Sequence, residues 1–356
     1  MPTTYGGDNI TFPDASTQNT SPKTGFVNRI INGDMRIDQR NAGASVTPFT
    51  AAVTYSVDRW GFYNSTSTNR FSAQQNAGSV TPPAGFTNYL GFTVTSAYTP
   101  SGSDEQFTYQ IIEGFNVADL GWGTANAQAV TVSFWVRSSL TGTHSGAVRN
   151  PNGYSRSYPF TFTVSAANTW ERKTITIPGD TGGSWNTNNL AGIQIGFNLG
   201  SGSSRLGTAN VWDTSSIAFT GATGSVQVSA TNGATFYITG VQLERGSVAT
   251  TFEFRSIGQE LDLCQRYYVG ARSYWFTSGY DAAYPSRNSG GLAWSYIFRA
   301  TPTINVLSGG MSGHHSTAPV SGTISGNGVY LEFQGAAVRT NANCGAEVTC
   351  TLSAEL

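Results

Sequence analysis

The sequence predicts an all-β protein: a jelly-roll β-sandwich with an N-terminal arm, one short helix and a smaller C-terminal β domain. Short segments of alternating apolar and polar residues recur between residues 28 and 255, and this alternation is typical of half-buried antiparallel strands. Clusters of Gly, Ser, Thr and Asn separate these segments as turns. Because no pattern of helical crossovers intervenes, a sandwich or jelly roll is favoured over an α/β fold.

The composition limits the classes of partner. Charged residues make up 11% of the 356 residues and the formal net charge is −1, whereas ordinary soluble domains carry roughly 25% charged residues. Such a chain has no basic field to attract nucleic acid or an acidic membrane, so we expect neither as a partner. No apolar run approaches the roughly 18 residues of a membrane span, and no secretory signal follows Met1. We therefore expect synthesis in the cytoplasm and no membrane insertion.

Residues 1–27 are predicted to form an extended attachment arm. They are rich in Thr, Ser, Asn, Gly and Pro, and Ile10 and Phe12 supply an isolated apolar point. This stretch cannot bury enough surface to fold alone. A terminal segment of this kind can order against a partner, so we expect Ile10 and Phe12 to make the contact.

Residues 28–255 are predicted to form the sandwich. Four segments within this range, near residues 106–111, 130–137, 158–164 and 193–199, show period-two patterning. Their apolar faces are formed by Phe107, Tyr109 and Ile111; by Val130, Val132, Phe134 and Val136; by Tyr158, Phe160, Phe162 and Val164; and by Ile193, Ile195, Phe197 and Leu199.

A connecting helix is predicted over residues 256–269. Ser256 and Gln259 form an S-x-x-Q capping box at its start, and apolar residues recur after it at helical spacing. We expect Leu261 and Cys264 to face a threefold axis, because small glycine-rich β units gain buried area by symmetric association as a homotrimer. The residues predicted to lie in the subunit interface are Leu261, Cys264, Tyr268 and Trp275.

Residues 270–356 are predicted to form the C-terminal β domain, whose small core would gain stability from trimerisation. This domain holds Cys344 and Cys350. Two readings of this pair stay open: a disulfide across a tight hairpin, or free thiols in a reducing compartment. His314 and His315 are too isolated for a zinc site, and we expect no metal and no cofactor.

No catalytic constellation stands out. Glycosidases need two carboxylates roughly 5–10 Å apart, and the acidic residues of this chain are scattered, with Asp58 beside Arg59 as an expected structural ion pair. His144 lies in a polar stretch without a nearby Asp for a triad. There is no G-x-S-x-G elbow and no phosphate loop, so catalysis is not expected and no catalytic residue is assigned.

Aromatic residues are the better candidates for a binding site, because the apolar faces of sugars stack on flat rings beside amide and hydroxyl groups. Three tryptophans stand in such surroundings. Each could instead serve packing or a subunit interface, whereas Trp60, Trp170 and Trp212 are expected in or near the core. The candidate glycan-binding residues are Trp122, Trp135, Arg137, Trp185, Asn186 and Asn188.

Four phrases resemble one protein group. They are N-R-I-I-N-G-D-M-R at residues 28–36, Y-S-V-D-R-W at 55–60, F-Y-I-T-G-V-Q-L-E-R-G at 236–246 and E-L-D-L-C-Q-R-Y-Y at 260–268. Together they resemble bacteriophage tail-fibre and receptor-binding virion proteins, and the I-T-F-P-D-A-S-T-Q segment at 10–18 resembles attachment ends of phage fibres. The resemblance implies a virion surface protein whose arm binds other virion proteins and whose body binds host-surface glycan. We expect the first and third phrases to mark the first and last strands of the sandwich.

Alternatives remain open at this level. The chain is short for a whole fibre, so it fits a fibre-tip module, a head fibre or a capsid decoration protein; a glycan depolymerase and a purely structural joint are further possibilities. The sandwich also resembles jelly-roll carbohydrate-binding modules, whose closing strand often helps to hold calcium. Here Thr239 and Gly240 stand at the positions of the expected aspartates, so hard oxygen ligands are missing.

Overall fold

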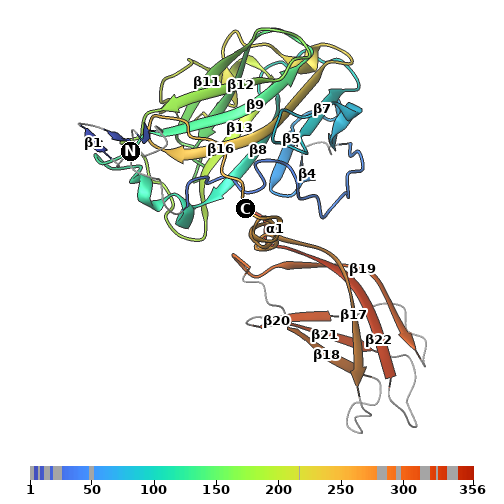
Figure 1. The fold of residues 1–356 in the computed structure, drawn as a ribbon. Helices are drawn as coiled ribbons and strands as arrows, with labels where there is room; N and C mark the ends of the chain where they lie inside the picture. The colour runs from blue at the N-terminus through green and yellow to red at the C-terminus, as the bar shows by residue number, and fades with distance from the viewer. Residues whose placement is uncertain are drawn as a thin grey trace.

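The structure is a computed structural model, and it confirms an all-β jelly-roll sandwich followed by a helix and a smaller β unit (Figure 1). It describes the backbone of residues 4–6, 9–11, 17–18, 26–47, 52–215, 217–278, 287–293, 298–312, 321–325, 328–334 and 344–356. Side chains are described for residues 26–47, 53–215, 217–270, 298–305 and 350–356.

Two antiparallel sheets form the sandwich. The six-stranded sheet has the order β11-β10-β13-β8-β5-β4, and the five-stranded sheet has the order β12-β9-β16-β7-β6. In chain order the strands are β4 (Ala52–Val57), β5 (Trp60–Asn64), β6 (Phe71–Gln75), β7 (Leu90–Val94), β8 (Glu105–Glu113), β9 (Val130–Ser138), β10 (Gly142–Arg149), β11 (Ser157–Val164), β12 (Glu171–Ile177), β13 (Ala191–Ser201) and β16 (Thr235–Arg245).

Short elements occupy the connections between these strands. Two of them, β14 (Leu206–Gly207) and β15 (Gly221–Ala222), form a parallel pair that packs on β10, β11 and β13. The others are single turns of 3₁₀ helix: η1 (Ala77–Ser79), η2 (Gly114–Asn116), η3 (Ala118–Leu120), η4 (Ser203–Arg205) and η5 (Val228–Ala230).

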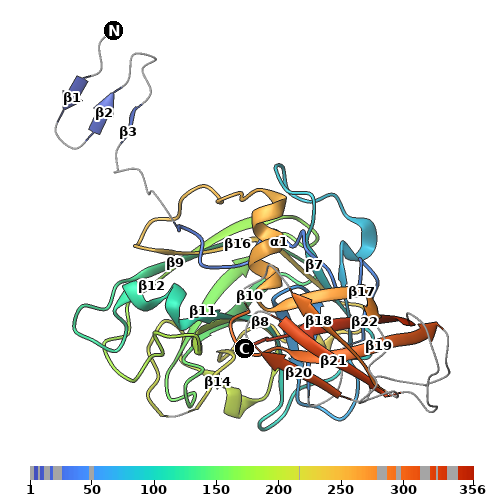
Figure 2. The ribbon, with the colours of Figure 1, turned by 90° about the horizontal axis from the view of Figure 1, so that it is seen from below.

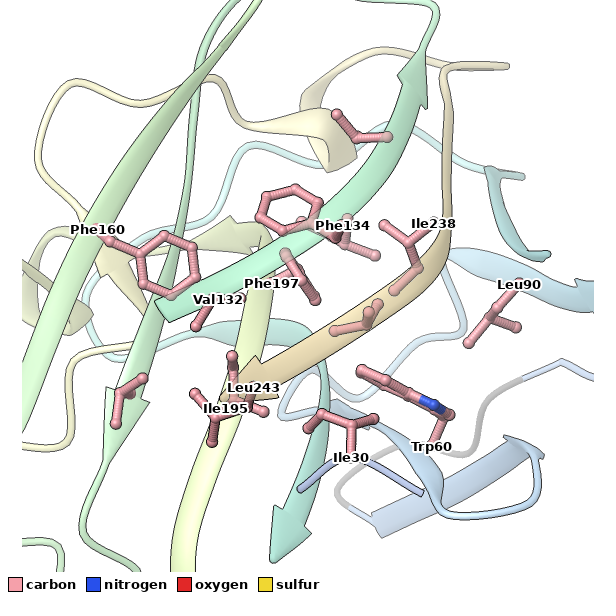
Figure 3. Close-up of a cluster of buried hydrophobic side chains, with 14 of the residues drawn as sticks. Ile30, Trp60, Leu90, Val132, Phe134, Phe160, Ile195, Phe197, Ile238 and Leu243 are labelled. Atoms are coloured by element: carbon pink, nitrogen blue, oxygen red, sulfur yellow. The ribbon is translucent and has the colours of Figure 1, made fainter. Parts of the chain in front are cut away.

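The core lies between the sheets, and three of the four predicted apolar faces point into it. The alternating residues of β9, β11 and β13 are all buried in one cluster. Phe134 and Phe197 meet at its centre with ring centroids 4.8 Å apart, as Figure 3 shows. Because successive side chains of a strand point to opposite faces, this packing fixes which residues of β9 face outward.

Strand β8 departs from the expected pattern. Phe107, Tyr109 and Ile111 do share one face, but they form a cluster separate from the main core, on the outer face of the six-stranded sheet. The inner face of β8 carries Thr108 instead, which sits in register with Phe62 and Phe197. Periodicity identified the strand, but it cannot tell which of two buried faces is the inner one.

The opening phrase is not a strand, which corrects the expectation for residues 28–36. Irregular backbone there lies beside the second half of β16, past the end of β7: Arg29 N donates to Leu243 O at 2.9 Å, and Val241 N donates to Gly33 O at 2.9 Å. A side chain at position 33 could not fit, because its Cβ would lie 2.2 Å from Val241 O. The two phrases therefore contact each other in the fold, and the closing phrase forms β16 as predicted.

Helix α1 spans Ile257–Gln265, and its capping box of Ser256 and Gln259 is present as predicted. The prediction that Cys264 faces a threefold axis is wrong. Cys264 is fully buried within this chain against Ile31, Ile37 and Tyr267, and Leu261 packs on the same cluster. Because the opening phrase of the sandwich already covers this face, Cys264 is not available to a subunit interface.

A polar junction fixes the helix and the chain's last residues to the sandwich. Arg266 binds Glu113 with contacts of 2.7 and 2.9 Å, and the Tyr267 hydroxyl donates to the same carboxylate at 2.9 Å. Arg59 forms an ion pair with Glu355 and lies 3.5 Å from the ring centroid of Tyr267. Tyr268 is another predicted interface residue, and it is half-buried. The Arg40 guanidinium covers its ring, with the Arg40 Cζ atom 3.5 Å from the Tyr268 ring centroid.

The C-terminal unit follows α1 as two three-stranded sheets, of order β17-β22-β19 and β18-β21-β20 (Figure 1). Cys344 and Cys350 lie on the same strand, six residues apart, which at about 3.3 Å per residue separates them by about 20 Å. This separation excludes the alternative of a disulfide between Cys344 and Cys350, and Cys350 is a free thiol. The strands are β17 (Tyr268–Ser278), β18 (Arg287–Ala293), β19 (Thr303–Ser312), β20 (Ser321–Ser325), β21 (Gly328–Gln334) and β22 (Cys344–Ser353).

The N-terminal arm contains a small antiparallel sheet of β1 (Thr4–Gly6), β2 (Asn9–Thr11) and β3 (Thr17–Gln18). Figure 2 shows it standing apart from the sandwich. Of the predicted contact residues, Ile10 lies in β2 with an undescribed side chain, and Phe12 lies outside the described residues; the side chain of Trp275 in β17 is likewise not described. None of the helices in the described part of the chain is long and apolar enough to cross a membrane.

Candidate functional site

Two of the three candidate tryptophans are core residues. Trp122 and Trp185 are 7% and 9% exposed and pack edge to face with ring centroids 4.8 Å apart. Trp212 completes the cluster, 5.4 Å from Trp122. Since a sugar can stack only on a ring face that solvent reaches, Trp122 and Trp185 offer no exposed stacking surface, and the packing alternative holds for both.

The amides beside Trp185 serve the loop itself. Asn186 Nδ2 donates to Ala191 O at 2.9 Å, and Asn188 Oδ1 accepts from Leu190 N at 3.0 Å. These local bonds close the turn before β13. The structure therefore does not bring the amides and the Trp185 ring together into an exposed platform.

Trp135 is the candidate that lies in a hollow. It sits on the outer face of β9, where it pairs across the sheet with Arg172 on β12 and Thr239 on β16. The hollow has a volume of about 390 Å³, within the usual size range of small-molecule sites. Its lining includes Trp135, Arg172, Phe86, Phe252 and Phe254, and we call it the Trp135 groove.

A glycine in β16 shapes one end of this groove. Gly240 has φ +60, a left-handed conformation that favours glycine, and it lies at the irregularity between Thr239 and Gln242. A Cβ at this position would lie 2.6 Å from the Phe86 ring and 3.2 Å from the Trp135 ring. Because Gly240 has no side chain, both rings can approach the strand. Gly240 is also the position where a calcium-binding module is expected to carry an aspartate, and here it shapes the groove.

The far wall is the segment after β16, which folds back over the outer face of the sheet. Gln242 Nε2 donates to Thr250 Oγ1 at 3.0 Å, and Glu244 accepts from Thr250 N at 2.7 Å. Gln242 and Glu244 are buried, so this network holds the wall in place from below.

Three phenylalanines form an aromatic triangle above the wall. Phe86, Phe252 and Phe254 have pairwise ring-centroid distances of 5.2, 5.3 and 4.8 Å. Phe254 is 52% exposed. The groove thus offers a partly exposed apolar surface beside hydroxyl groups and one guanidinium, a combination that suits a ligand with both apolar faces and hydroxyls.

The two arginines on this face differ in role. Arg172 is exposed, lines the groove and donates from Nη2 to Thr250 O at 2.8 Å. Arg137, which was predicted to bind glycan, lies two residues along β9 from Trp135, over the Tyr237 ring at 5.5 Å from its centroid. It is not among the residues that line the groove.

Asp58 and Glu113 are two buried carboxylates that are engaged in structural contacts. Asp58 does form an ion pair, as predicted, but with Arg40 at 3.6 Å and not with Arg59. Burial is the main cause that raises the pKa of Asp58 to about 6, and Arg40 and Gln39 oppose it. Among the residues that the structure describes, no three His, Cys, Asp or Glu side chains gather as metal ligands.

Sequence reasoning missed Phe86, Arg172, Phe252 and Phe254. Phe252 and Phe254 alternate a few residues after the closing strand phrase, and this spacing was an available signal of an extended segment. Phe86 could not be joined to them from the sequence, because more than 160 residues separate them along the chain. The pairing of β7, which follows Phe86, with β16, which precedes Phe252, brings the two segments together.

No protein-family model matches the chain, and no curated protein matches it by sequence. Solved structures give distant similarities. The enzymatically active domain of tailspike protein 4 from bacteriophage CBA120 matches with 13% identity and a TM-score of 0.34, covering 62% of this chain and 21% of that one. The family 11 carbohydrate-binding module from Clostridium thermocellum, in complex with a β-1,3-1,4-mixed-linked tetrasaccharide, matches with 13% identity and a TM-score of 0.28, covering 56% and 96%.

The CBM22-1-GH10 modules of the Clostridium thermocellum xylanase 10B, complexed with xylohexaose, match with 15% identity and a TM-score of 0.28, covering 58% of this chain and 30% of that one. The strand order and the core define the fold of this chain, and the lining residues define the hollow.

Proposed function

We propose that this chain is a bacteriophage virion surface protein, a tail fibre or fibre-tip module, whose sandwich binds host-cell glycan in the Trp135 groove. The observation that carries the binding proposal is a solvent-open hollow with an indole at its floor and an aromatic triangle on its rim. Weak single sites of this kind gain avidity from repeated copies on a particle.

The chemistry of the lining supports a sugar ligand over a purely apolar one. Trp135 and the phenylalanines offer faces for C–H stacking, while Ser133, Thr250 and Thr251 bring hydroxyl groups to the same hollow. Arg172 adds donors that can reach ring or hydroxyl oxygens. Because the net charge is −1, long-range attraction contributes little, and recognition depends on shape and stacking.

The test is binding of the full chain to an array of bacterial surface polysaccharides, followed by titration of the best binder into variants. Trp135→Ala is expected to weaken binding at least tenfold, because a buried indole contact is a typical hot spot. Trp170→Ala is the matched control, since Trp170 is a half-buried tryptophan that packs on Tyr89 and does not line the groove. Equal affinity of the Trp135→Ala variant and the unmodified protein would exclude the groove.

The same polysaccharide, incubated with the protein, distinguishes binding from depolymerisation. The proposal predicts no new reducing ends over the incubation. Accumulation of reducing ends would replace it by the glycan depolymerase alternative.

The virion assignment is supported by the four sequence phrases and not by the groove. We propose that the arm, including Ile10 and Phe12, docks the chain on another virion protein. Antibody labelling of particles in negative stain would show label at the tail tip if the tail assignment holds. Label over the capsid would instead indicate a head fibre or decoration protein.

We also propose that the chain assembles as a homotrimer, supported by the small, glycine-rich C-terminal β unit, which gains buried area on association. The interface is not the Cys264 face of α1, which the sandwich covers. Light scattering of the purified protein should give three times the 37.7 kDa chain mass. A monomer mass would contradict the trimer.

A further inference from the structure

The Trp135 groove carries charge of one sign only. Among the described residues that line the hollow, Arg172 is the one charged side chain, and there is no Asp or Glu. Glu244 lies under the wall, where it is buried and accepts from Thr250 N, and it does not line the hollow. A cationic group at the edge of an apolar hollow, with no acidic group beside it in the lining, favours a ligand that carries negative charge.

The guanidinium of Arg172 is held in position but keeps donors free. Its Nη2 atom donates to Thr250 O at 2.8 Å, and Thr250 is fixed in turn by Glu244, which accepts from Thr250 N at 2.7 Å. The side chain is exposed, and its Nε and Nη1 atoms donate to no residue in the described part of the chain. Because a planar guanidinium matches a carboxylate through two parallel N–H···O bonds, an anchored arginine with free donors suits a carboxylate.

Arg172 stands beside the indole on which a sugar would stack. Arg172 on β12 and Trp135 on β9 are directly opposite each other across the sheet, and the Cβ atoms of such a pair are about 4.5–5.5 Å apart. This spacing is comparable with the width of one pyranose ring. A substituent on the rim of a sugar that covers Trp135 can therefore reach the Arg172 guanidinium. The carboxylate of a hexuronic acid is such a substituent, since it is bound directly to the ring.

The second arginine of this face, Arg137, provides an internal comparison. It lies over the Tyr237 ring, 5.5 Å from the ring centroid, and does not line the hollow. Its charge acts on a bound ligand only at longer range, where salt screens it. A preference for an anionic ligand should therefore depend on Arg172 and not on Arg137.

We propose that the Trp135 groove selects a carboxylate-bearing sugar, a hexuronic acid residue of a glycan, over its neutral counterpart. This inference rests on the proposed function, because it names the class of sugar that the same site takes. The apolar face of the sugar stacks on the Trp135 indole, and the carboxylate accepts from the free donors of Arg172. Because Arg172 is exposed, the ion pair adds only a few-fold to an affinity that stacking supplies.

The test is titration of the full chain with two matched pairs of sugars: the methyl glycosides of glucuronic acid and glucose, and those of galacturonic acid and galactose. The members of each pair differ only in having a carboxylate or a hydroxymethyl group on the ring. Calorimetry gives the affinities, and the indole N–H resonance of Trp135 reports the site. In at least one pair the acid should bind about three- to fivefold tighter than the neutral sugar at low ionic strength, as expected for an exposed ion pair. Salt at about 1 M should reduce this ratio toward one.

Variants assign the preference to one side chain. Arg172→Gln removes the charge but keeps a hydrogen-bond donor, so it should bring the ratio to about one while the affinity for the neutral sugar stays within about twofold. Arg137→Gln is the matched control and should leave the ratio unchanged. The inference is overturned if neither acid binds, if acid and neutral sugar bind equally in both pairs, or if the preference survives in Arg172→Gln.

Two further arms separate failure of this inference from failure of the groove. Trp135→Ala should weaken the binding of acid and neutral sugar alike. If it does so while acid and neutral sugar bind equally, the groove stands and the charge preference is wrong; if it changes neither affinity, the groove itself is wrong and the inference fails with it. Acetate should not compete with the uronide at equal concentration, and displacement by acetate would contradict the contact between the sugar and the indole.

Discussion

The two outer faces of the sandwich are built from similar residues but differ in how accessible they are. The five-stranded sheet carries the Trp135 groove, which is open and whose walls are held by satisfied hydrogen bonds. The outer face of the six-stranded sheet carries Arg149, which is buried beneath the Tyr154 ring and whose Nε and Nη1 atoms have no hydrogen-bond partner among the described residues. The comparison teaches that the accessibility of an aromatic ring depends on its surroundings: a wall keeps the Trp135 ring in an open hollow, whereas the Tyr154 ring lies over a buried guanidinium.

The largest expected effect separates a core tryptophan from a groove tryptophan. Trp185→Ala should lower the free energy of unfolding by about 3–5 kcal/mol, the usual cost of emptying a buried aromatic site, because Trp185 is packed between Trp122 and Trp212. Denaturant titration measures it. Trp135→Ala is the matched control and should cost much less; equal losses would mean that Trp135 is also a core residue.

A second change sharpens the account of how the groove is shaped. Gly240→Ala places a Cβ 2.6 Å from the Phe86 ring at a left-handed φ. It should lower the free energy of unfolding by about 1–3 kcal/mol. Adding Phe86→Ala should recover the steric part only, so a double-mutant cycle is expected to show coupling. Strict additivity of the two changes would contradict contact between Gly240 and Phe86.

A pH dependence tests the environment of Asp58, which forms an ion pair with Arg40 next to Tyr268. The pKa of buried Asp58 is about 6 in the folded protein, above the ordinary 3.8. The folded state therefore binds this proton at a higher pH than the unfolded state does. Protonation of Asp58 stabilises the folded protein as the pH falls through about 6, and this gain levels off below the pKa of the unfolded state. Relative to Asp58→Asn, the unmodified protein should gain on the order of 1–3 kcal/mol between pH 7.5 and 5. Parallel stability curves for the two proteins would show that Asp58 does not titrate in this range.

The smallest effect concerns Arg172 at the edge of the groove. Arg172→Ala should change the free energy of unfolding by less than about 0.5 kcal/mol, because the side chain is exposed. Affinity for the polysaccharide that binds best is expected to fall only a few-fold, since Arg172 adds hydrogen bonds to a site whose main contact is stacking. A loss as large as that of Trp135→Ala would shift the centre of the site toward β12.

The sequence predicted the sandwich and its strands because alternation survives wherever one face of a strand meets the core, as in β9 and β11. It failed at β8, where both faces are buried and the apolar one points outward. It also failed at residues 28–36, because contact with β16 fixes that phrase without regular strand structure.

Of the candidate site, only Trp135 could be placed from the sequence, through its position on the outer face of a predicted strand. The apparent surface loop at Trp185 misled, since a glycine- and asparagine-rich segment can also close over a tryptophan core. Arg149 on β10 and Gln194 on β13 lie opposite each other on the outer face of the six-stranded sheet. No local pattern reports such a meeting, because it arises from strand order alone.

The most direct measurement follows the indole N–H resonances of the eight tryptophans during addition of the polysaccharide that binds best on the array. Our account predicts that the Trp135 signal shifts in proportion to bound ligand while those of Trp60, Trp122 and Trp185 stay in place. A shift confined to Trp275 or Trp294 would place the receptor site in the C-terminal unit and contradict the groove.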